Sequence, residues 1–251
     1  ELCHNHTLRK VARNDIVSYF QEKHDIIGFF GKSKLIQKHN LIKNSSGGKM
    51  KILIIGGNGT IGKKVSDHFS KKHDVLIAGR NSGDITVDIV DSQSIKTMFE
   101  SIGKVDAIVC IAGEAKWGAF DSLTEEDFYI GLRSKLMGQV NLVRIGQNYL
   151  NTGGSFTLTT GILADHPVEM TTSAAMVNGG IHSFAKAVSL ELKNGIRINV
   201  VSSGLVEDAI DKYEAYFPGH NPIPMTKVIN GYVKSVEGKR TGEIIRMYDN
   251  C

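Results

Sequence analysis

The stretch that most constrains the fold is an apolar run at residues 51–55 followed by a glycine-rich turn at 56–62. The apolar, largely β-branched residues predict a buried parallel strand, and apolar residues recur at helical spacing after the turn. Gly57, Gly59 and Gly62 match the spacing G-x-G-x-x-G in this strand–turn–helix context. Glycines there let a pyrophosphate approach the backbone, and free N–H groups at the helix start can bind it. We therefore expect a dinucleotide site at this turn, the alternative being an ordinary glycine-rich turn.

The composition predicts a globular protein without a membrane-spanning segment. Hydrophobic residues make up 41% of the 251-residue chain and charged residues 22%, as is typical of a domain with a buried core. No apolar run approaches the roughly 18 residues that a membrane span needs. The three cysteines, Cys3, Cys110 and Cys251, are scattered and odd in number, which is typical of a reducing compartment. We therefore expect a cytoplasmic protein without a membrane partner.

Residues 1–49 form a segment with its own charge balance. They hold nine of the 30 Lys and Arg residues but only four of the 26 Asp and Glu residues, so the rest of the chain is close to neutral. The segment has no nucleic-acid-binding motif, and we expect no nucleic-acid partner. We expect 1–49 to be a basic leader, either non-native or disordered, and 50–251 to be an NAD(P)-binding Rossmann domain. Cys3, His4 and His6 lack further ligands, so we expect no metal site there.

From Met50 onward, strand and helix patterns alternate. The strands expected after the first cover residues 74–78, 85–87, 106–111, 154–159, 197–202 and 242–247. The helices expected between them begin at Ser92, at Thr124, at Thr172 or Ser173, and at Thr226, and two of them are long, ending near Tyr149 and Lys193. This alternation predicts an α/β fold, a Rossmann-type doubly wound parallel sheet in three α/β/α layers. In such a fold, ligands bind at the carboxyl ends of the strands.

Four local sequences are distinctive: GGNGTIG at 56–62, CIAG at 110–113, GGSFTLTT at 153–160 and GIRINVVSSG at 195–204. They resemble motifs of the short-chain dehydrogenase/reductase family. The resemblance extends over residues 50 to about 249, with Thr60 where the family often has glycine and Ser203 where it often has proline. It implies an oxidoreductase whose partners are a nicotinamide dinucleotide and a small-molecule substrate.

The catalytic pattern of the family is incomplete in this chain. Family members pair a tyrosine with a lysine four residues later, and aligning that pattern places Ala174 at the tyrosine and Asn178 at the lysine. The chain therefore resembles a divergent subgroup that lacks the Tyr-x-x-x-Lys pair. A hydroxyl is kept at the serine position as Thr160, and Lys135 stands where the family has a helix asparagine. Our candidate catalytic residues are Thr160, to polarise a carbonyl, and Lys135; a structural threonine and a solvated lysine are the alternatives.

The residues after the second expected strand bear on the choice of cofactor. No acid that could hold a ribose 2′-hydroxyl follows this strand directly, whereas Arg80, with Ser82 and Asn58, could bind a 2′-phosphate. We therefore expect NADP(H) to be preferred over NAD(H), the alternative being a solvated loop arginine. Asp88 and Ile89 resemble a pair that meets the adenine edge, or else they cap the next helix. The expected cofactor-binding residues are Gly56, Gly57, Asn58, Gly59, Thr60, Ile61, Gly62, Arg80, Ser82, Asp88, Ile89, Ala112 and Gly113.

Two hypotheses about function follow from these residues. The first is an NADP(H)-dependent oxidoreductase of the short-chain dehydrogenase type, acting on an unknown carbonyl or alcohol. The second is a catalytically degenerate NADP(H)-binding protein, a sensor or a partner subunit. His166 and His182 could supply a proton, although we expect surface or packing roles for both, and residues 205–224 should cover the substrate. The family resemblance also implies a homodimer or homotetramer.

Overall fold

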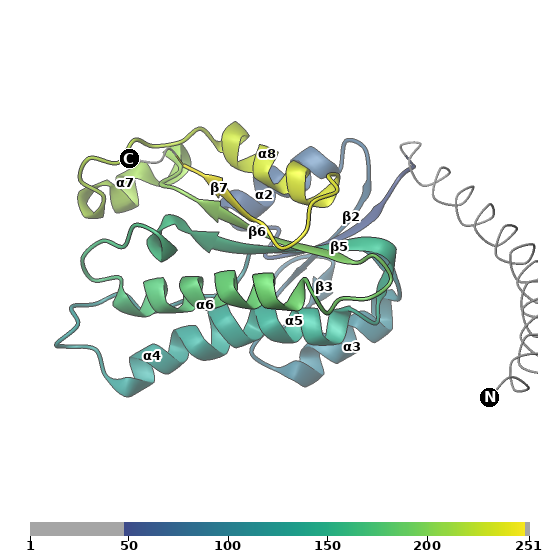
Figure 1. Ribbon diagram of the computed structural model, residues 1–251, viewed down its shortest axis with the longest axis horizontal. Helices are drawn as coiled ribbons and strands as arrows, with labels where there is room; N and C mark the ends of the chain where they lie inside the picture. The colour runs from purple at the N-terminus through teal and green to yellow at the C-terminus, as the bar shows by residue number, and fades with distance from the viewer. Residues whose placement is uncertain (1–47, 249–251) are drawn as a thin grey trace, which may run out of the picture. The chain divides into compact units, whose positions relative to one another are not determined.

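The computed structural model describes residues 48–248, which contain one seven-stranded sheet (Figure 1). Its strands are Lys51–Ile55 (β1), Asp74–Gly79 (β2), Ile85–Thr86 (β3), Val105–Cys110 (β4), Leu150–Gly161 (β5), Arg197–Ser203 (β6) and Ile244–Met247 (β7). Their order across the sheet is β3-β2-β1-β4-β5-β6-β7, and every pair of neighbours is parallel. The predicted doubly wound parallel sheet is confirmed.

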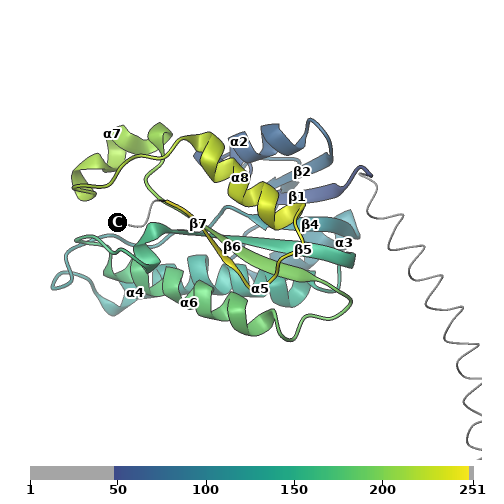
Figure 2. The ribbon, with the colours of Figure 1, turned by 45° about the horizontal axis from the view of Figure 1, so that its top comes forward.

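Helices cover both faces of this sheet, as Figure 2 shows. On one face lie Ser92–Ile102 (α3), Glu125–Gly131 (α4), Gly138–Gly146 (α5) and Thr172–Val188 (α6). On the other face lie Thr60–Phe69 (α2) and Met225–Val236 (α8), and the short helix Ile210–Tyr213 (α7) comes between β6 and α8 in the chain. The three α/β/α layers are therefore those expected from the sequence.

Each face of the sheet has its own hydrophobic core, because parallel strands in such folds are buried on both sides. Neighbouring residues of β1 point in opposite directions: Leu53 belongs to the core under α3, α5 and α6, whereas Ile54 belongs to the core under α2 and α8. Phe99 and Tyr232 are among the largest fully buried side chains of these two cores. The two cores fix the sheet, so the loops at the carboxyl ends of its central strands lie close together.

Helix α4 does not run directly into α5, although a single helix is expected from Thr124 to about Tyr149. The residues between them, Leu132–Met137, form a π-helical segment of six residues. Such segments are rare and have no clear sequence signature, so the sequence did not predict this one. The helix continues at Gly138, which packs so closely that a Cβ there would lie 2.9 Å from the Ile89 side chain. The π-helical segment carries Lys135, one of the two candidate catalytic residues.

Helix starts follow the predicted chemistry, with one correction. Asp91, rather than Ser92, caps α3, because its carboxylate accepts a hydrogen bond from the Gln93 N–H at 2.8 Å. The predicted start of α4 at Thr124 carries a capping box, in which Thr124 and Asp127 each accept a hydrogen bond from the other's backbone N–H. Both caps satisfy N–H groups that a helix leaves unpaired at its start.

The largest differences from the expected boundaries are in β5 and α6. β5 covers Leu150–Gly161 rather than 154–159, because its pairing with β6 continues as far as Gly161. Helix α6 ends at Val188 rather than near Lys193, where the Ser189 hydroxyl donates to the Lys186 carbonyl at 2.7 Å. Such a local side-chain bond competes with continuation of the helix.

The expected leader, 1–49, lies outside the described residues except for Gly48 and Lys49, and so do Cys3, His4 and His6. Within residues 48–248, no helix is long and apolar enough to cross a membrane. In the same range, no three His, Cys, Asp or Glu side chains gather as metal ligands would.

Candidate active site

The glycine-rich turn follows β1, which lies between β2 and β4 in the sheet, the place where ligands bind in folds of this kind. Gly56 has a φ of +80°, and a Cβ there would lie 2.7 Å from the Ile111 carbonyl oxygen. Gly62 packs against the Gly56 carbonyl, so neither glycine leaves room for a side chain. At Gly59, by contrast, a Cβ would meet nothing closer than 3.4 Å, and no side chain of the described residues caps α2. The N–H groups at the start of α2 are therefore available to an anion such as a pyrophosphate.

Asn58, after β1, contacts Ser82, after β2, and Arg80 directly follows β2. Asn58 Nδ2 donates a hydrogen bond to Ser82 Oγ at 3.1 Å. The Arg80 guanidinium lies 3.8 Å from a carboxylate oxygen of Asp88 and 3.7 Å from one of Glu114. Because long ion pairs between exposed groups contribute at most about 1 kcal/mol, Arg80 can exchange these carboxylates for a phosphate group at little cost.

The two residues expected at the adenine edge make structural contacts. Asp88 accepts a hydrogen bond from the Val90 N–H at 3.0 Å, and its own N–H donates to Ser94 Oγ at 3.0 Å, so it orders the turn before α3. Ile89 is buried in the core, and its side chain packs against Gly138. The structure therefore places Asp88 beside Arg80 but places the Ile89 side chain in the core rather than at the surface of the site.

A cavity of about 280 Å³ opens at the carboxyl ends of β4, β5 and β6. The sequence-predicted residues that line it are Ile61, Gly113, Lys135, Thr160, Ala174 and Asn178. They come from the glycine-rich turn, the loop after β4, the π-helical segment, β5 and α6. The structure thus brings both candidate catalytic residues, and the two positions at which we expected the family's Tyr and Lys, to one cavity that the glycine-rich turn also reaches.

The backbone at the end of β5 is held firmly and presents Thr160 toward α6. Thr160 is 3% exposed, and its Oγ1 lies 2.8 Å from Nε2 of His182 on α6. The hydroxyl of Thr159 points to the other face of the sheet and lies 2.9 Å from the Tyr232 hydroxyl. The Gln139 amide donates to the Thr159 carbonyl and accepts from the Thr159 N–H, both at 3.0 Å. Of the two neighbouring threonines, only Thr160 has its hydroxyl on the side of α6.

Lys135 reaches the cavity because the loop after β4 passes unusually close to it. Gly113 has a φ of +105°, and a Cβ there would lie 2.8 Å from the Lys135 Cα. Burial lowers the pKa of the Lys135 ammonium, and it also raises the pKa of the nearby Cys110 thiol to about 11. Between residues 48 and 248, the ammonium makes no hydrogen bond or ion pair of its own. It therefore lines the cavity as an unpaired donor.

Asn178 supplies the complementary group from α6. Its side chain is 5% exposed, and its Oδ1 atom has no hydrogen-bond partner among the described residues. An unpaired buried carbonyl oxygen costs free energy, and such atoms in native proteins often belong to sites that a ligand completes. One turn earlier, Ala174 offers only a methyl group. The cavity therefore contains an unpaired acceptor on α6 and an unpaired donor on the neighbouring π-helical segment.

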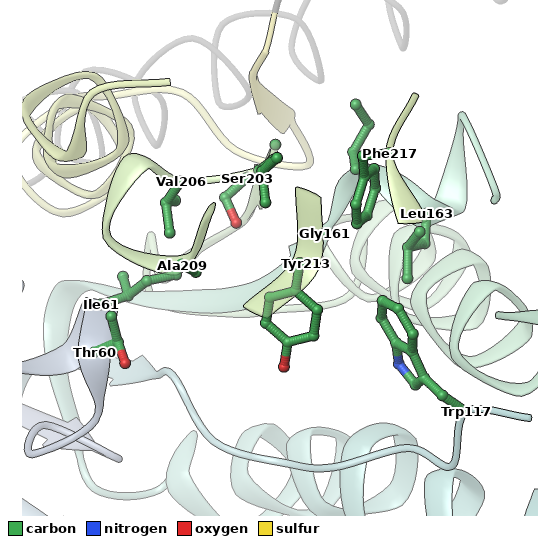
Figure 3. A pocket seen from close by; sticks show the side chains of 13 residues that line it. Thr60, Ile61, Trp117, Gly161, Leu163, Ser203, Val206, Ala209, Tyr213 and Phe217 are labelled. Atoms are coloured by element: carbon green, nitrogen blue, oxygen red, sulfur yellow. The ribbon is translucent and has the colours of Figure 1, made fainter. Parts of the chain in front are cut away.

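A second cavity, of about 270 Å³, adjoins the first (Figure 3). The two share the lining residues Ile61, Trp117, Gly161, Leu163 and Ser203. The segment expected to cover the substrate forms one wall through Tyr213, Phe217 and the residues around Leu205. The rings of Trp117 and Tyr213 lie with centroids 5.5 Å apart. Because most of its lining is apolar, this cavity suits an uncharged, apolar group.

The sequence did not reveal a polar cluster near His182. Arg246 donates two hydrogen bonds to Asp165, at 2.9 and 3.0 Å, and the Tyr248 hydroxyl donates to the same carboxylate. The Arg246 hydrogen bonds lower the pKa of Asp165 to about 2. Asp165 and Arg246 are 81 residues apart in the chain, so no local pattern could indicate their contact. For His182 a signal exists, since it lies four residues after Asn178 on the same helix face.

Comparison with known proteins identifies relatives of this chain. A family model described as enoyl-(acyl carrier protein) reductase matches residues 62–221. The curated short-chain dehydrogenase/reductase ucsE of Acremonium sp. is 31% identical over 106 residues, which are 41% of this chain and 40% of that protein. The chain thus aligns with less than half the length of this relative.

Solved structures extend the comparison to the whole fold. The protein lin1944 from Listeria innocua is 48% identical, with a TM-score of 0.78, and the match covers 79% of this chain and 100% of that one. A small-chain dehydrogenase in complex with NADPH is 26% identical, with a TM-score of 0.70, and the match covers 79% of this chain and 96% of that one. Because the family model also matches more than half of the residues, the chain belongs to the short-chain dehydrogenase/reductase family of oxidoreductases.

Proposed function

We propose that the protein is an NADP(H)-dependent oxidoreductase that interconverts a carbonyl compound and its alcohol. The observation that carries this proposal is the convergence of Thr160, Lys135 and Asn178 on one cavity that also reaches the glycine-rich turn. A structural relative is a dehydrogenase in complex with NADPH, which supports the choice of cofactor. A cytoplasmic location is part of the same proposal.

The described residues fit a phosphorylated nicotinamide dinucleotide. The uncapped start of α2 would hold the pyrophosphate, and Arg80 with Ser82 would hold the 2′-phosphate. The unpaired Lys135 ammonium and Asn178 Oδ1 would bind hydroxyl groups of the nicotinamide ribose, one as donor and the other as acceptor. When bound, NADP(H) supplies the hydride.

Lys135 and Asn178 show an exchange relative to the family pattern. The family has an asparagine on the helix before β5 and a lysine on the helix after it, whereas this chain has Lys135 on the first and Asn178 on the second. Both residues line the cavity, so an ammonium and an amide are kept at the site with their helices exchanged. Because the ammonium is still present, we propose that the site can bind the cofactor and transfer hydride with Asn178 at the position of the family's lysine.

The substrate oxygen would be held by the Thr160 hydroxyl, with the Lys135 ammonium stabilising negative charge that develops on it. The rest of the substrate would occupy the adjoining cavity between Trp117 and the segment that carries Tyr213. Because that cavity is lined mainly by apolar side chains, we expect an uncharged substrate with an aromatic or aliphatic body.

Turnover of aromatic carbonyl compounds tests this function. The full chain with NADPH should reduce at least one of benzaldehyde, acetophenone and benzil, monitored by loss of NADPH absorbance. Thr160→Val should lower kcat by about 10²- to 10³-fold, the usual effect of removing one donor to a developing oxyanion. Thr157→Val is the matched control, because the Thr157 hydroxyl contacts Ser235 at 2.7 Å and does not line either cavity; it should keep turnover.

Two outcomes of this experiment would contradict the proposal. Saturable NADPH binding without turnover of any carbonyl would instead favour a dinucleotide-binding protein without hydride chemistry. Reduction of crotonyl-CoA alone would assign the site to an enoyl thioester, the substrate class named in the description of the matching family model.

We also expect two copies of the chain to associate through α4, the π-helical segment and α6. Ile130, Met137 and Met176 on these elements are exposed although they are large and apolar, as is typical of an interface. Light scattering on the purified chain should give the mass of a dimer or tetramer, and the mass of a single chain would contradict this expectation.

A further inference from the structure

Thr160 has a partner that the proposed function does not use. His182 Nε2 lies 2.8 Å from Thr160 Oγ1, and both side chains are more than nine-tenths buried. We propose that His182 positions the Thr160 hydroxyl and relays protons through it, in place of the tyrosine that the family carries where this chain has Ala174. This inference rests on the proposed function, because the relay requires Thr160 to contact the substrate oxygen.

The positioning role follows from the hydrogens available to the pair. A threonine hydroxyl has one hydrogen to donate, whereas its oxygen can accept. When His182 Nε2 carries a proton, it donates to Thr160 Oγ1, and the hydroxyl hydrogen is left for the substrate oxygen. When Nε2 carries no proton, the hydroxyl donates to His182 instead, and Thr160 can accept a proton from an alcohol. The presence or absence of a proton on His182 Nε2, which depends on the tautomer as well as on the charge of the ring, therefore sets the direction in which Thr160 transfers a proton.

The same two proton transfers serve carbonyl reduction and, in reverse, alcohol oxidation. In carbonyl reduction, the carbonyl carbon receives the hydride and its two electrons, while the Thr160 O–H bond breaks and its proton passes to the substrate oxygen. The proton on Nε2 of the His182 imidazolium then restores the Thr160 hydroxyl, and solvent reprotonates the neutral imidazole. In alcohol oxidation the same bonds change in reverse, and neutral His182 accepts the proton that Thr160 passes on.

The charges around His182 come from three elements. Burial has the largest effect and lowers the pKa of His182. Asp165, after β5, raises this pKa, whereas Arg246 on β7 and Lys186 on α6 lower it. The Tyr248 hydroxyl shares the Asp165 carboxylate with Arg246. The balance lowers the pKa of His182 below its ordinary value, which favours the neutral imidazole that can accept a proton in alcohol oxidation. Carbonyl reduction should therefore become faster as the pH falls through the pKa of His182, and alcohol oxidation should become slower.

His182→Gln in the full chain separates proton relay from positioning, because glutamine can still hydrogen-bond to Thr160 but cannot titrate. With benzaldehyde and NADPH, and with benzyl alcohol and NADP⁺, we expect kcat to fall by about 10²- to 10⁴-fold, as for loss of an acid–base group. The opposite pH dependences of the two directions should disappear, while the KM for NADPH should change little. His68→Gln is the matched control, because His68 lies on α2 and lines neither cavity.

A second measurement needs neither cofactor nor turnover. NMR of the ¹⁵N-labelled chain gives the tautomer and the pKa of the His182 imidazole, and Thr160→Val should change both if the two side chains are bonded in solution. An imidazole unaffected by Thr160→Val, or a His182→Gln variant with the kcat and pH dependence of the wild type, would overturn the relay. Absence of turnover in the wild-type chain would overturn the proposed function instead, and with it the catalytic use of the pair.

Discussion

The Arg80 guanidinium can pair either with the carboxylates beside it or with a phosphate of the cofactor. It lies near two carboxylates, those of Asp88 and Glu114, while Ser82 and Asn58 are bonded to each other beside it. The sequence predicts that Arg80, with help from Ser82 and Asn58, binds a 2′-phosphate, and this stays a prediction. It could not predict the carboxylates, because Glu114 lies after β4 and reaches Arg80 only across the sheet.

We predict that Arg80→Ala weakens NADPH binding by about 1–3 kcal/mol, the usual range for loss of a hydrogen bond to a charged group. NADH binding should change little, since NADH has no 2′-phosphate. Calorimetric titration of both cofactors measures the two effects. Arg144→Ala, on the distant helix α5, is the control and should alter neither affinity. Equal losses for NADPH and NADH would contradict the phosphate clamp.

Among single side chains, the sequence indicated Thr160 and Lys135 as candidates but not the partner of Thr160. The two were found from their places in family motifs, and the structure brings them to one cavity. His182 was expected to pack or to lie at the surface, yet its ring contacts Thr160 at 2.8 Å. Contact between a helix side chain and a strand side chain depends on helix rotation over the sheet, which a single sequence does not determine.

Among the elements, the π-helical segment Leu132–Met137 and the loop after β4 pack directly against each other. The strands and helices on either side were predictable from apolar periodicity and caps, and the capping box at Thr124 is present. The π-helical segment was not, because nothing in its composition distinguishes it from an ordinary helix. Its packing depends on Gly113, whose missing side chain lets the loop approach the Lys135 backbone.

Gly113→Ala should damage both stability and cofactor binding. The added Cβ would lie 2.8 Å from the Lys135 Cα, and a φ of +105° is strained for any residue with a side chain, so we expect a loss of about 1–3 kcal/mol in the free energy of unfolding. NADPH affinity should fall as Lys135 is displaced. Urea denaturation and cofactor titration measure the two effects.

Gly103→Ala separates strain from crowding in this experiment. Gly103 also has a positive φ, of +68°, but a Cβ there would meet nothing within 4 Å. Because φ 68° with ψ −153° is a conformation that only glycine adopts readily, we expect Gly103→Ala to lose about 1–3 kcal/mol of stability without any change in NADPH affinity. Unchanged affinity in Gly113→Ala as well would contradict the role given to the packing between the loop and Lys135.

At the scale of the whole molecule, the alternation of strands and helices predicted the three layers, and the sheet order follows the same pattern. The sequence did not predict contacts between side chains more than 80 residues apart. The cluster of Asp165, Arg246 and Tyr248 is the main example, since it joins the loop after β5 to the last strand. This cluster ties β7 to the region around His182.

The Asp165 cluster should make stability depend on pH in the acidic range. Hydrogen bonds from Arg246 lower the pKa of folded Asp165 from its ordinary 3.8 to about 2, so the charged carboxylate stabilises the fold above about pH 4 and this contribution is lost as the pH falls toward 2. Asp165→Asn should therefore lower the free energy of unfolding at pH 6 by about 1 kcal/mol, as for a partly exposed pair. Its difference from the wild type should shrink between pH 4 and pH 2.

Urea denaturation at pH 6, 4 and 3 measures this dependence. Asp121→Asn is the control, because Asp121 is exposed and lies outside the cluster, and it should match the wild type at each pH. A constant difference between Asp165→Asn and the wild type would show that the ion pair is not the source of the stability.

Binding of NADP(H) in the cavity beside the glycine-rich turn can be measured through Trp117. It is the only tryptophan of the chain and lines both cavities, so energy transfer from its ring to bound NADPH reports occupation of the site. We predict saturable quenching of tryptophan emission by NADPH, with a Kd of the order of 10 μM, and at least about tenfold weaker quenching by NADH. No saturation by either cofactor up to about 1 mM would contradict binding of NADP(H) in this cavity.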